Sequence, residues 1–310
     1  MTMSPVIVPT LQSRIRYYVR TLGLFVAMGL GAIFTEARIF APLIPWLVAG
    51  MLFLASLDLR IGPGALRTGV WKILAASVII AFAGFALLAK IDRDLALAAF
   101  LTALTPTAIS APVIIEFLDG RVEYVVTSVL MTNVAVALAL PFLLPLVAGG
   151  AGGISTRELF GAICFVVLIP LGLARCVGWL PAGAARAFAK AKPVSFPLWL
   201  VALFLVTAKS TYVVRYENLV TAQKLVAIGA VALGVCAASF GAGALLGGKA
   251  FRREASQALG QKNNAFSIWI ALTFVSPVVA LGPTCYVLFH NLYNALQLVV
   301  HERKRARGGV

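Results

Sequence analysis

The stretch Gly260-Gln261-Lys262-Asn263-Asn264 decides how the rest of this chain is interpreted. It lies inside an apolar segment that runs from about residue 251 to residue 280. At 1.5 Å per residue, the steps from Arg253 to Lys262 reach roughly 13 Å, close to the middle of a ~30 Å hydrocarbon core. A cation and three carboxamides at that depth are costly wherever lipid reaches them. We therefore expect these side chains to face the protein interior and to mark a functional site.

The composition is that of a polytopic membrane protein. Of the 310 residues, 61% are hydrophobic and 12% are charged, and apolar runs recur along the whole chain. The net charge of +15 is compatible with nucleic-acid binding. However, the basic residues fall between the apolar runs and in the tails, where orientation signals belong. We expect a lipid bilayer and no nucleic acid as partner.

Ten membrane spans can be counted, and they divide into two halves of five. A Gly-rich linker, residues 149–156, separates residues 1–148 from residues 157–301, and a basic cytoplasmic tail, residues 302–310, follows. Because each half holds an odd number of spans, the second half must be inverted relative to the first, as in many transporters. The expected fold is all-α, with two inverted five-helix repeats. The spans lie near residues 17–34, 39–57, 68–89, 95–118, 122–148, 157–178, 195–214, 222–246, 252–280 and 282–300.

The basic residues also predict the orientation. With the N-terminus in the cytoplasm, 18 of the 26 Lys and Arg residues fall on the inner side and 7 on the outer side, with Lys262 inside the membrane. Such an excess on one side marks the cytoplasmic face. We therefore expect a multi-pass membrane protein with both termini in the cytoplasm. The resemblance described below implies a bacterial protein, and hence the inner membrane.

The fourth span of each half is expected to be interrupted. In the first half, Thr105-Pro106-Thr107-Ala108-Ile109-Ser110-Ala111-Pro112 places two prolines in the middle of an apolar run. Each proline removes a backbone donor and crowds the preceding turn, so the helix should break there. A simple proline kink is the alternative. The equivalent span of the second half carries residues 260–264, and paired interruptions in inverted halves indicate a substrate site near the midplane. We therefore expect two discontinuous helices that cross.

The candidate substrate-binding residues come from the two interruptions and from the fifth span. Thr127, Ser128 and Thr132 of the fifth span are weaker candidates, which either line the same cavity or bond between helices. His290 and Asn291 form either a bond between helices or a relay. No nucleophile motif or cluster of His, Asp and Glu indicates an enzyme or a metal site, so no catalytic residue is expected. The candidates are Thr107, Ser110, Pro112, Asn133, Gln261, Lys262, Asn263 and Asn264.

Three stretches resemble the bile acid:sodium symporter family. Residues 106–120 match a proline and small residues that cross the membrane middle and lead into a Gly-containing turn. Residues 258–263 match the family motif acid-x-Gly-x-Gln-Asn, and residues 276–281 with 289–291 match its closing segment. The resemblance covers nearly the whole chain in spacing and is specific in sequence over the last third. It implies ten spans, a core domain with two crossing discontinuous helices, and a movable panel domain.

The chain departs from this family at the sodium ligands. A hard cation needs oxygen ligands, and the matching positions here carry almost none. We therefore expect neither sodium binding of the family kind nor any cofactor. The family's acidic ligand falls on Ala258, its second-site Gln on Lys262, its Ser-Asn pair on Ala111-Pro112, and its fifth-span hydroxyls on Val125 and Val129.

The expected function is secondary transport of a small organic anion, such as a carboxylate, by alternating access. Lys262 would replace sodium as the positive charge, and because a buried ammonium can release a proton, transport would be proton-coupled or uncoupled. No acid lies within helical reach of Lys262, so its partners should be carbonyls at the broken helix ends, Asn263, Asn133 or an anionic substrate. One alternative is that Lys262 has a purely structural role: it would stabilise the crossing helices by hydrogen bonds and bind no ligand. The other functions to weigh are a sodium-coupled symporter with unrecognised ligands and a channel-like protein.

Overall fold

The computed structural model describes residues 11–57, 69–149, 153–217 and 219–306, with side chains for residues 22–57, 69–149, 153–217 and 219–305. The structure is 87% helical, and the described residues form no strand. Residues 1–10, 150–152 and 307–310 lie outside the described residues, and with them lie both ends of the chain and three residues of the Gly-rich linker. Arg60 and Arg67 of the charge count also lie outside the described residues.

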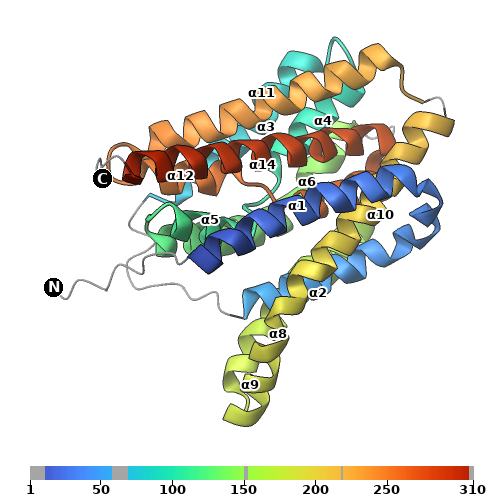
Figure 1. Cartoon of the computed structure of the whole chain (residues 1–310). Helices are drawn as coiled ribbons and strands as arrows, with labels where there is room; N and C mark the ends of the chain where they lie inside the picture. The colour runs from blue at the N-terminus through green and yellow to red at the C-terminus, as the bar shows by residue number, and fades with distance from the viewer. Residues whose placement is uncertain (1–10, 58–68, 150–152, 218, 307–310) are drawn as a thin grey trace.

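The first part of the chain forms helices up to the Gly-rich linker, with an interruption after residue 104 (Figure 1). A 3-10 helix that contains Pro42 leads into the second long helix. The elements are α1 (Leu11–Ile33), η1 (Thr35–Leu43), α2 (Ile44–Ser56), α3 (Trp71–Leu88), α4 (Arg93–Leu104), α5 (Ala111–Phe117) and α6 (Val122–Ala148).

The second part repeats long helices with short π and 3-10 turns between or within them. Its elements are α7 (Thr156–Ile163), η3 (Cys164–Leu168), α8 (Ile169–Cys176), η4 (Val177–Trp179), α9 (Ala182–Ala191), η5 (Lys192–Val194), α10 (Ser195–Tyr216), α11 (Ala222–Gly247), α12 (Arg252–Gly260), α13 (Asn264–Ile270), η6 (Ala271–Val275) and α14 (Pro277–Ala306).

Two boundaries differ from the sequence-based expectation. The last helix begins at Pro277 rather than near residue 282, because Ser276 is extended (φ −162°) and its hydroxyl accepts a bond from the Val279 N–H at 3.2 Å. Ser and Pro favour these two positions at a helix start. The alanine-rich stretch 182–191 forms the additional helix α9, where only a connection was expected. Alanine is the strongest helix former, so a connection of this composition folds as a helix.

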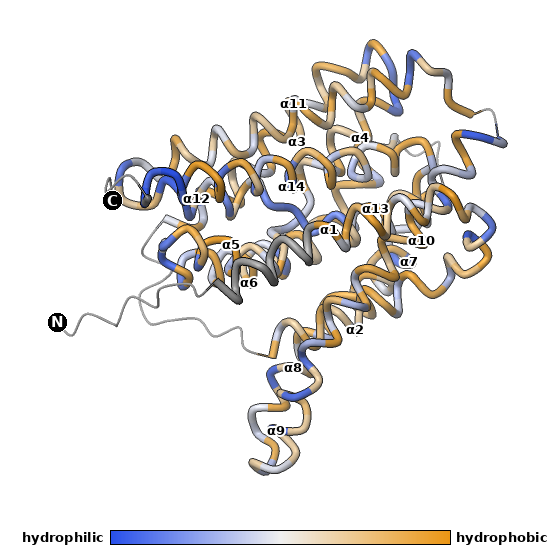
Figure 2. Tube along the Cα trace, in the orientation of Figure 1, coloured by the Kyte–Doolittle hydropathy of each residue, from blue (hydrophilic) through white to orange (hydrophobic). Residues whose placement is uncertain are grey.

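Among the described residues, six helical segments are long and apolar enough to cross a membrane, which agrees with a helical membrane protein. Hydrophobic residues dominate along these helices, whereas hydrophilic residues concentrate at helix ends and turns (Figure 2). The segments broken by the two interruptions are too short to be counted individually. The six are Thr35–Ser56, Trp71–Leu88, Val122–Ala148, Thr156–Trp179, Ala182–Tyr216 and Ala222–Gly247.

The helices pack in two groups. Helices α1, α2, α8 and α10 with the turn η1 form one group, and helices α3, α4, α5, α6, α11, α12 and α14 form the other. The short helix α13 lies where the groups meet, because it contacts α2 and α10 on one side and α4 and α14 on the other. Both interrupted segments therefore belong to the second group or border on it.

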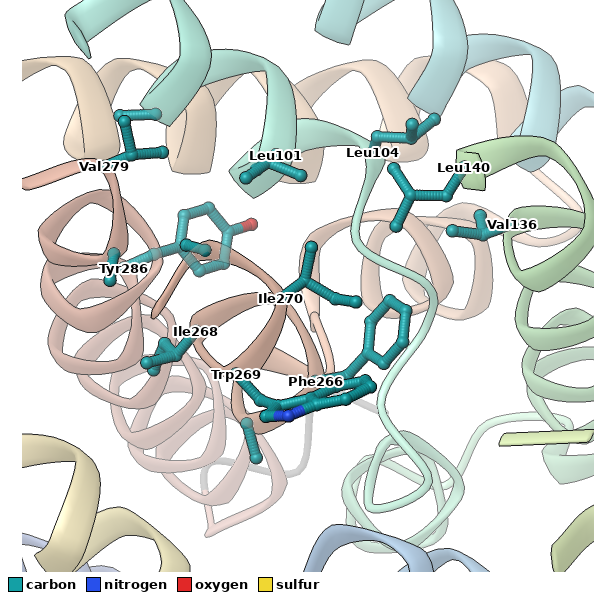
Figure 3. Packing of buried hydrophobic residues seen from close by; sticks show 14 of the residues in the cluster. Leu101, Leu104, Val136, Leu140, Phe266, Ile268, Trp269, Ile270, Val279 and Tyr286 are labelled. Carbon is teal, nitrogen blue, oxygen red and sulfur yellow. The ribbon is translucent and has the colours of Figure 1, made fainter. Parts of the chain in front are cut away.

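Apolar packing holds α13 in place from all sides. All seven of its residues are buried, and a helix that is hydrophobic around its circumference belongs in an interior. Phe266, Trp269 and Ile270 of α13 lie against side chains from α4, α6 and α14 (Figure 3). This packing fixes the position of Asn264, the first residue of α13, and thereby of the preceding residues 260–263.

Candidate functional site

The two predicted helix interruptions meet in the structure. Helix α4 ends at Leu104 and α5 begins at Ala111, while α12 ends at Gly260 and α13 begins at Asn264. Backbone groups freed by a helix break need partners when water is excluded, and the two breaks supply them to each other. We call this paired region the crossing. Its bonds are an antiparallel bridge between Thr107 and Lys262, Ala108 N–H to the Gln261 carbonyl (2.8 Å), and Asn263 N–H to the Pro106 carbonyl (2.9 Å).

Thr107 is held at the crossing by three bonds to side chains or backbone of other elements. Its N–H donates to Oγ1 of Thr132 (3.0 Å), and its own hydroxyl donates to the carbonyl of Ala258 (2.6 Å). Its carbonyl accepts from Nδ2 of Asn133 (3.1 Å). Helix α6 therefore braces the crossing, and both Thr132 and Asn133 bond between segments. Thr127 and Ser128 instead donate to carbonyls of their own helix.

Lys262 turns away from the interruption and into the space between α3 and α4. Only 3% of Lys262 is exposed. Its ammonium donates to the carbonyl of Ala103 (2.7 Å) and to the hydroxyl of Ser77 (3.1 Å), which itself donates to the same carbonyl (2.7 Å). The negative end of the α4 dipole favours a cation at this place. A carbonyl at a broken helix end was one expected partner of Lys262, and the Ala103 carbonyl is such a group. Asn133 and Asn263 were also expected as partners, but neither of them bonds to the ammonium, because the Lys262 side chain points toward α3.

Ser110 and Gln261 form the accessible edge of the crossing. Nε2 of Gln261, a buried residue, donates to the hydroxyl of Ser110 (2.9 Å), and Ser110 is exposed. Pro112 is buried in the first turn of α5, where its missing N–H leaves no donor unsatisfied. Pro112 thus defines the start of the helix, and its side chain offers no polar contact.

Asn263 and Asn264 lie at the start of α13, and both are buried. Nδ2 of Asn264 donates to the Lys262 carbonyl (3.3 Å) and lies 3.5 Å from Nδ1 of His290. Buried polar atoms are nearly always hydrogen-bonded, yet four amide atoms around the crossing have no partner among the described residues. These atoms are available to a ligand or to water. They are Asn133 Oδ1, Gln261 Oε1, Asn263 Nδ2 and Asn264 Oδ1.

Three residues that the sequence analysis did not predict contact the crossing or its lysine: Tyr286, Phe240 and Ser77. The hydroxyl of Tyr286 on α14 donates to the Gly260 carbonyl (2.6 Å). A Cβ atom on Gly260 would lie closer than 3.0 Å to the ring of Phe240, so only glycine fits beneath that ring. Ser77 is the third residue that the sequence did not reveal. A single hydroxyl in an apolar run is its only signal, and such hydroxyls commonly bond to their own helix.

Four of the positions that the sequence analysis aligned with sodium ligands offer no side-chain oxygen. Ala258, Ala111, Val125 and Val129 are buried and apolar, and hard cations need oxygen ligands. The carbonyl of Ala258 is already bonded to Thr107. The described residues also contain no group of three or more His, Cys, Asp or Glu side chains that could hold a metal.

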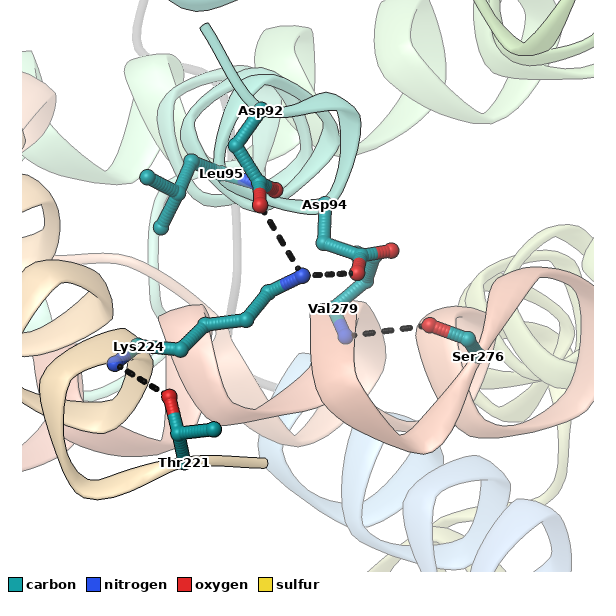
Figure 4. Close-up of polar contacts among 7 residues, drawn as sticks. All are labelled: Asp92, Asp94, Leu95, Thr221, Lys224, Ser276 and Val279. Carbon is teal, nitrogen blue, oxygen red and sulfur yellow. Dashed lines mark hydrogen bonds and ion pairs between the residues drawn. The ribbon is translucent and has the colours of Figure 1, made fainter. Parts of the chain in front are cut away.

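An ion-pair cluster ties the start of α4 to the start of α11 (Figure 4). Lys224 pairs with Asp92 (3.0 Å) and with Asp94, and Asp92 also accepts the Leu95 N–H (3.0 Å) as the N-cap of α4. Burial alone would raise the pKa of Asp92. The bonds from Leu95 and Lys224 outweigh burial, and the pKa lies below its usual value. The cluster fixes the end of α4 that lies opposite the crossing.

No protein-family model matches this chain, and no curated protein shows significant sequence similarity to it.

Proposed function

We propose that this protein is a secondary transporter of a small organic anion, such as a carboxylate, and that it works by alternating access. The observation that carries this proposal is the crossing, where two interrupted helices from different halves of the sequence bond to each other at Thr107 and Lys262. Interrupted helices that meet inside a membrane protein form the substrate sites of many secondary transporters. The partnerless amide atoms give such a site hydrogen-bonding capacity.

Ten spans in two inverted halves belong to the same proposal. The elements of the described residues supply ten segments when α4 is joined with α5 and α12 with α13 across their interruptions, α7 with α8 through η3, and α9 with α10 through η5. The two interrupted segments are then the fourth of each half, as an inverted repeat requires. The group containing α1, α2, α8 and α10 would move against the group that holds the crossing. The charge distribution favours both termini in the cytoplasm of a bacterial cell.

Lys262 serves in this proposal as a fixed positive charge in place of a coupling cation. Its ammonium is bonded to neutral groups, and none of the ion pairs among the described residues includes it. An ammonium without a carboxylate partner in a low-dielectric interior creates a positive potential that attracts an anion. The exposed Ser110 and its partner Gln261 are the polar groups through which the anion would first contact the crossing.

Sodium-coupled transport is the second candidate, and one observation favours it. The oxygens of Asn133, Gln261 and Asn264 are buried without partners among the described residues, and carboxamide oxygens are suitable ligands for hard cations. Sodium would then bind beside Lys262 rather than at the positions used by the family.

Uptake into proteoliposomes tests both candidates. A panel of radiolabelled carboxylates is offered under a sodium gradient alone, a proton gradient alone, or neither, with protein-free liposomes as the control. We expect uptake and counterflow of at least one carboxylate, without a sodium requirement. A steep, saturable sodium dependence that potassium and choline do not replace would establish the second candidate. Absence of both uptake and counterflow for every carboxylate would contradict organic-anion transport.

A further inference from the structure

One face of α14 carries a line of polar residues through the interior. His290, Asn294, Gln297 and His301 follow each other at spacings of four, three and four residues, which places them on one side of the helix. We call these four residues the α14 stripe. The stripe is about 16 Å long, roughly half the thickness of a hydrocarbon core. The chain has two histidines, and both belong to this stripe.

Each part of the stripe contacts a different element. At one end, Nδ1 of His290 lies 3.5 Å from Nδ2 of Asn264 at the crossing. In the middle, Nε2 of Gln257 on α12 donates to Oδ1 of Asn294 (2.9 Å) and to Oε1 of Gln297. At the other end, Nε2 of His301 lies 2.9 Å from Oδ2 of Asp119, in the turn between α5 and α6. The stripe therefore runs from the crossing to an acid at the end of the molecule where α12 begins.

Polar atoms without a hydrogen-bond partner among the described residues lie along the α14 stripe. His290, Asn294 and His301 are all buried, whereas the side chain of Asp119 is 22% exposed. Asn264 Oδ1, Gln257 Oε1 and Asn294 Nδ2 have no hydrogen-bond partner among the described residues. Buried polar atoms of this kind are normally satisfied by ordered water. Without water each of these atoms would be buried with its hydrogen-bonding capacity unused, which destabilises the folded protein, so we expect water molecules along this line.

The charged groups near the two histidines differ. Asn264 and the ring of Tyr286 contact His290, and none of the ion pairs among the described residues includes it. His301 faces Asp119, which Arg305 also approaches (3.6 Å). Two further charges near this turn are engaged with backbone: Arg253 donates to the Leu118 carbonyl, and Glu254 accepts the Arg121 N–H. The Arg121 guanidinium lies over the ring of Phe251, and Glu116 and Glu123 are the other acids that flank this turn. Lys262 points toward α3 and α4, away from His290.

We propose that the α14 stripe conducts protons between Asp119 and the crossing, and that His290 accepts the coupling proton. This inference rests on the proposed transport function and identifies its coupling ion. A proton from bulk water enters at Asp119 and His301 and passes along the water molecules beside Asn294 and Gln257. It then binds a ring nitrogen of His290, leaving a neutral water behind. In the conformation open to the other side, His290 gives this proton to a water molecule of that side and becomes neutral again. Chains of His and acidic residues serve as proton relays in membrane transporters.

Deuterium exchange at the C2 position of histidine tests water access to the stripe without any substrate. The full-length protein in lipid nanodiscs is incubated in D₂O, and its two histidines are resolved by peptide mass spectrometry. We expect both histidines to exchange. Asn294→Leu should slow exchange at His290 about tenfold or more, because it removes a polar group that holds water. The matched control is Asn291→Leu, since the Asn291 amide donates to the Val287 carbonyl of its own helix. Exchange at His301 but not at His290, or an unchanged rate in Asn294→Leu, would overturn the inference.

Transport assays test the coupling role of His290. In proteoliposomes, His290→Gln should abolish proton-driven accumulation of the carboxylate while counterflow persists, because counterflow needs no net proton movement. Asn294→Leu should reduce accumulation, and Asn291→Leu should not. Proton-driven accumulation that survives in His290→Gln and Asn294→Leu would refute the relay while leaving organic-anion transport intact. If the unmodified protein shows no counterflow, the proposed function fails instead, and the exchange experiment alone decides whether the stripe is wet.

Discussion

Thr107 and Lys262 pair through their backbones as a single antiparallel bridge in an otherwise helical structure. The bridge fixes the two helix ends relative to each other while leaving both side chains free to reach other elements. Thr107 bonds to the Ala258 carbonyl, and Lys262 reaches α3 and α4. Substitution of either of these two side chains therefore leaves the backbone bonds of the bridge available.

Replacing Thr132 with valine should destabilise the protein through the crossing. The Thr107 N–H donates to the Thr132 hydroxyl, and valine has the same shape but no acceptor. A buried N–H left without a partner costs about 1–3 kcal/mol. Unfolding of the purified variant in mixed micelles measures this cost. The matched control is Thr127→Val, whose lost hydroxyl bonds to its own helix, and it should cost less. Equal losses in both variants would show that the bond to Thr107 contributes nothing.

Alanine at Gly243 should disrupt the contact between α11 and α12, whereas alanine at Gly241 should not. A Cβ atom at Gly243 would lie closer than 3.0 Å to the Ala255 carbonyl, which is backbone and moves only with α12. Such overpacking costs about 1–3 kcal/mol. Nothing lies within 4 Å of a Cβ atom at Gly241, so the helix propensity of alanine should leave stability unchanged or raise it. Thermal unfolding in detergent compares the two, and an intact Gly243→Ala protein would contradict the close approach.

The interruptions could be predicted from the sequence because their signals are local. Pro106 and Pro112 remove backbone donors wherever they occur, and polar residues 260–264 stand out in any apolar run. The contact between the two interruptions could also be predicted. The interrupted spans are the fourth of each half, and equivalent interruptions in inverted halves meet at the substrate site. The direction of Lys262 could not be predicted, since it depends on Ser77 of α3, and the packing of α3 against α4 is a tertiary property.

The charge of Asp92 should make the free energy of unfolding depend on pH, and only at acidic pH. Its pKa in the folded protein lies below the ordinary value of 3.8, so its contribution is present above that value and is lost as the pH falls through the folded pKa. Asp92→Asn keeps the N-cap acceptor but removes the charge that pairs with Lys224. Because the pair is partly exposed, the variant should be less stable at pH 7 by about 1 kcal/mol or less. The two proteins should converge only when the pH has fallen below the folded pKa of Asp92, which itself lies below the ordinary value of 3.8. A difference that persists at that acidic end would contradict the assignment.

Lys304 and Lys90 should be accessible from opposite sides of the membrane. Both side chains are exposed, Lys304 near the end of α14 and Lys90 in the turn before α4. In a cysteine-free background, Lys90→Cys should react with an impermeant maleimide added to intact cells. Lys304→Cys should react only after the cells are opened, because the basic side is expected to be cytoplasmic. Labelling of Lys304→Cys in intact cells would reverse the orientation.

Replacing Lys262 with methionine separates a fixed cation from a purely structural role. Methionine keeps the length of the side chain and removes its charge. The Ser77 hydroxyl can still donate to the Ala103 carbonyl, so no acceptor is left without a partner. We therefore expect Lys262→Met to fold and insert. If the ammonium attracts the anion, uptake should fall about tenfold or more, since a bond to a charged group contributes about 1.5–3 kcal/mol. Lys209→Met is the matched control, because Lys209 is a partly buried lysine of α10 away from the crossing.

Lys262→Gln extends the same experiment to the coupling ion. Glutamine puts a carbonyl oxygen, a suitable ligand for a hard cation, in place of the ammonium that contacts Ser77 and Ala103. Uptake by this variant should therefore recover when sodium is supplied, whereas uptake by Lys262→Met should not. Initial rates with and without sodium measure the difference. A stable Lys262→Met protein that transports at the normal rate across about pH 5 to 8 would show that Lys262 is neither the substitute for a cation nor a proton carrier. Its bonds to Ala103 and Ser77 would then be purely structural.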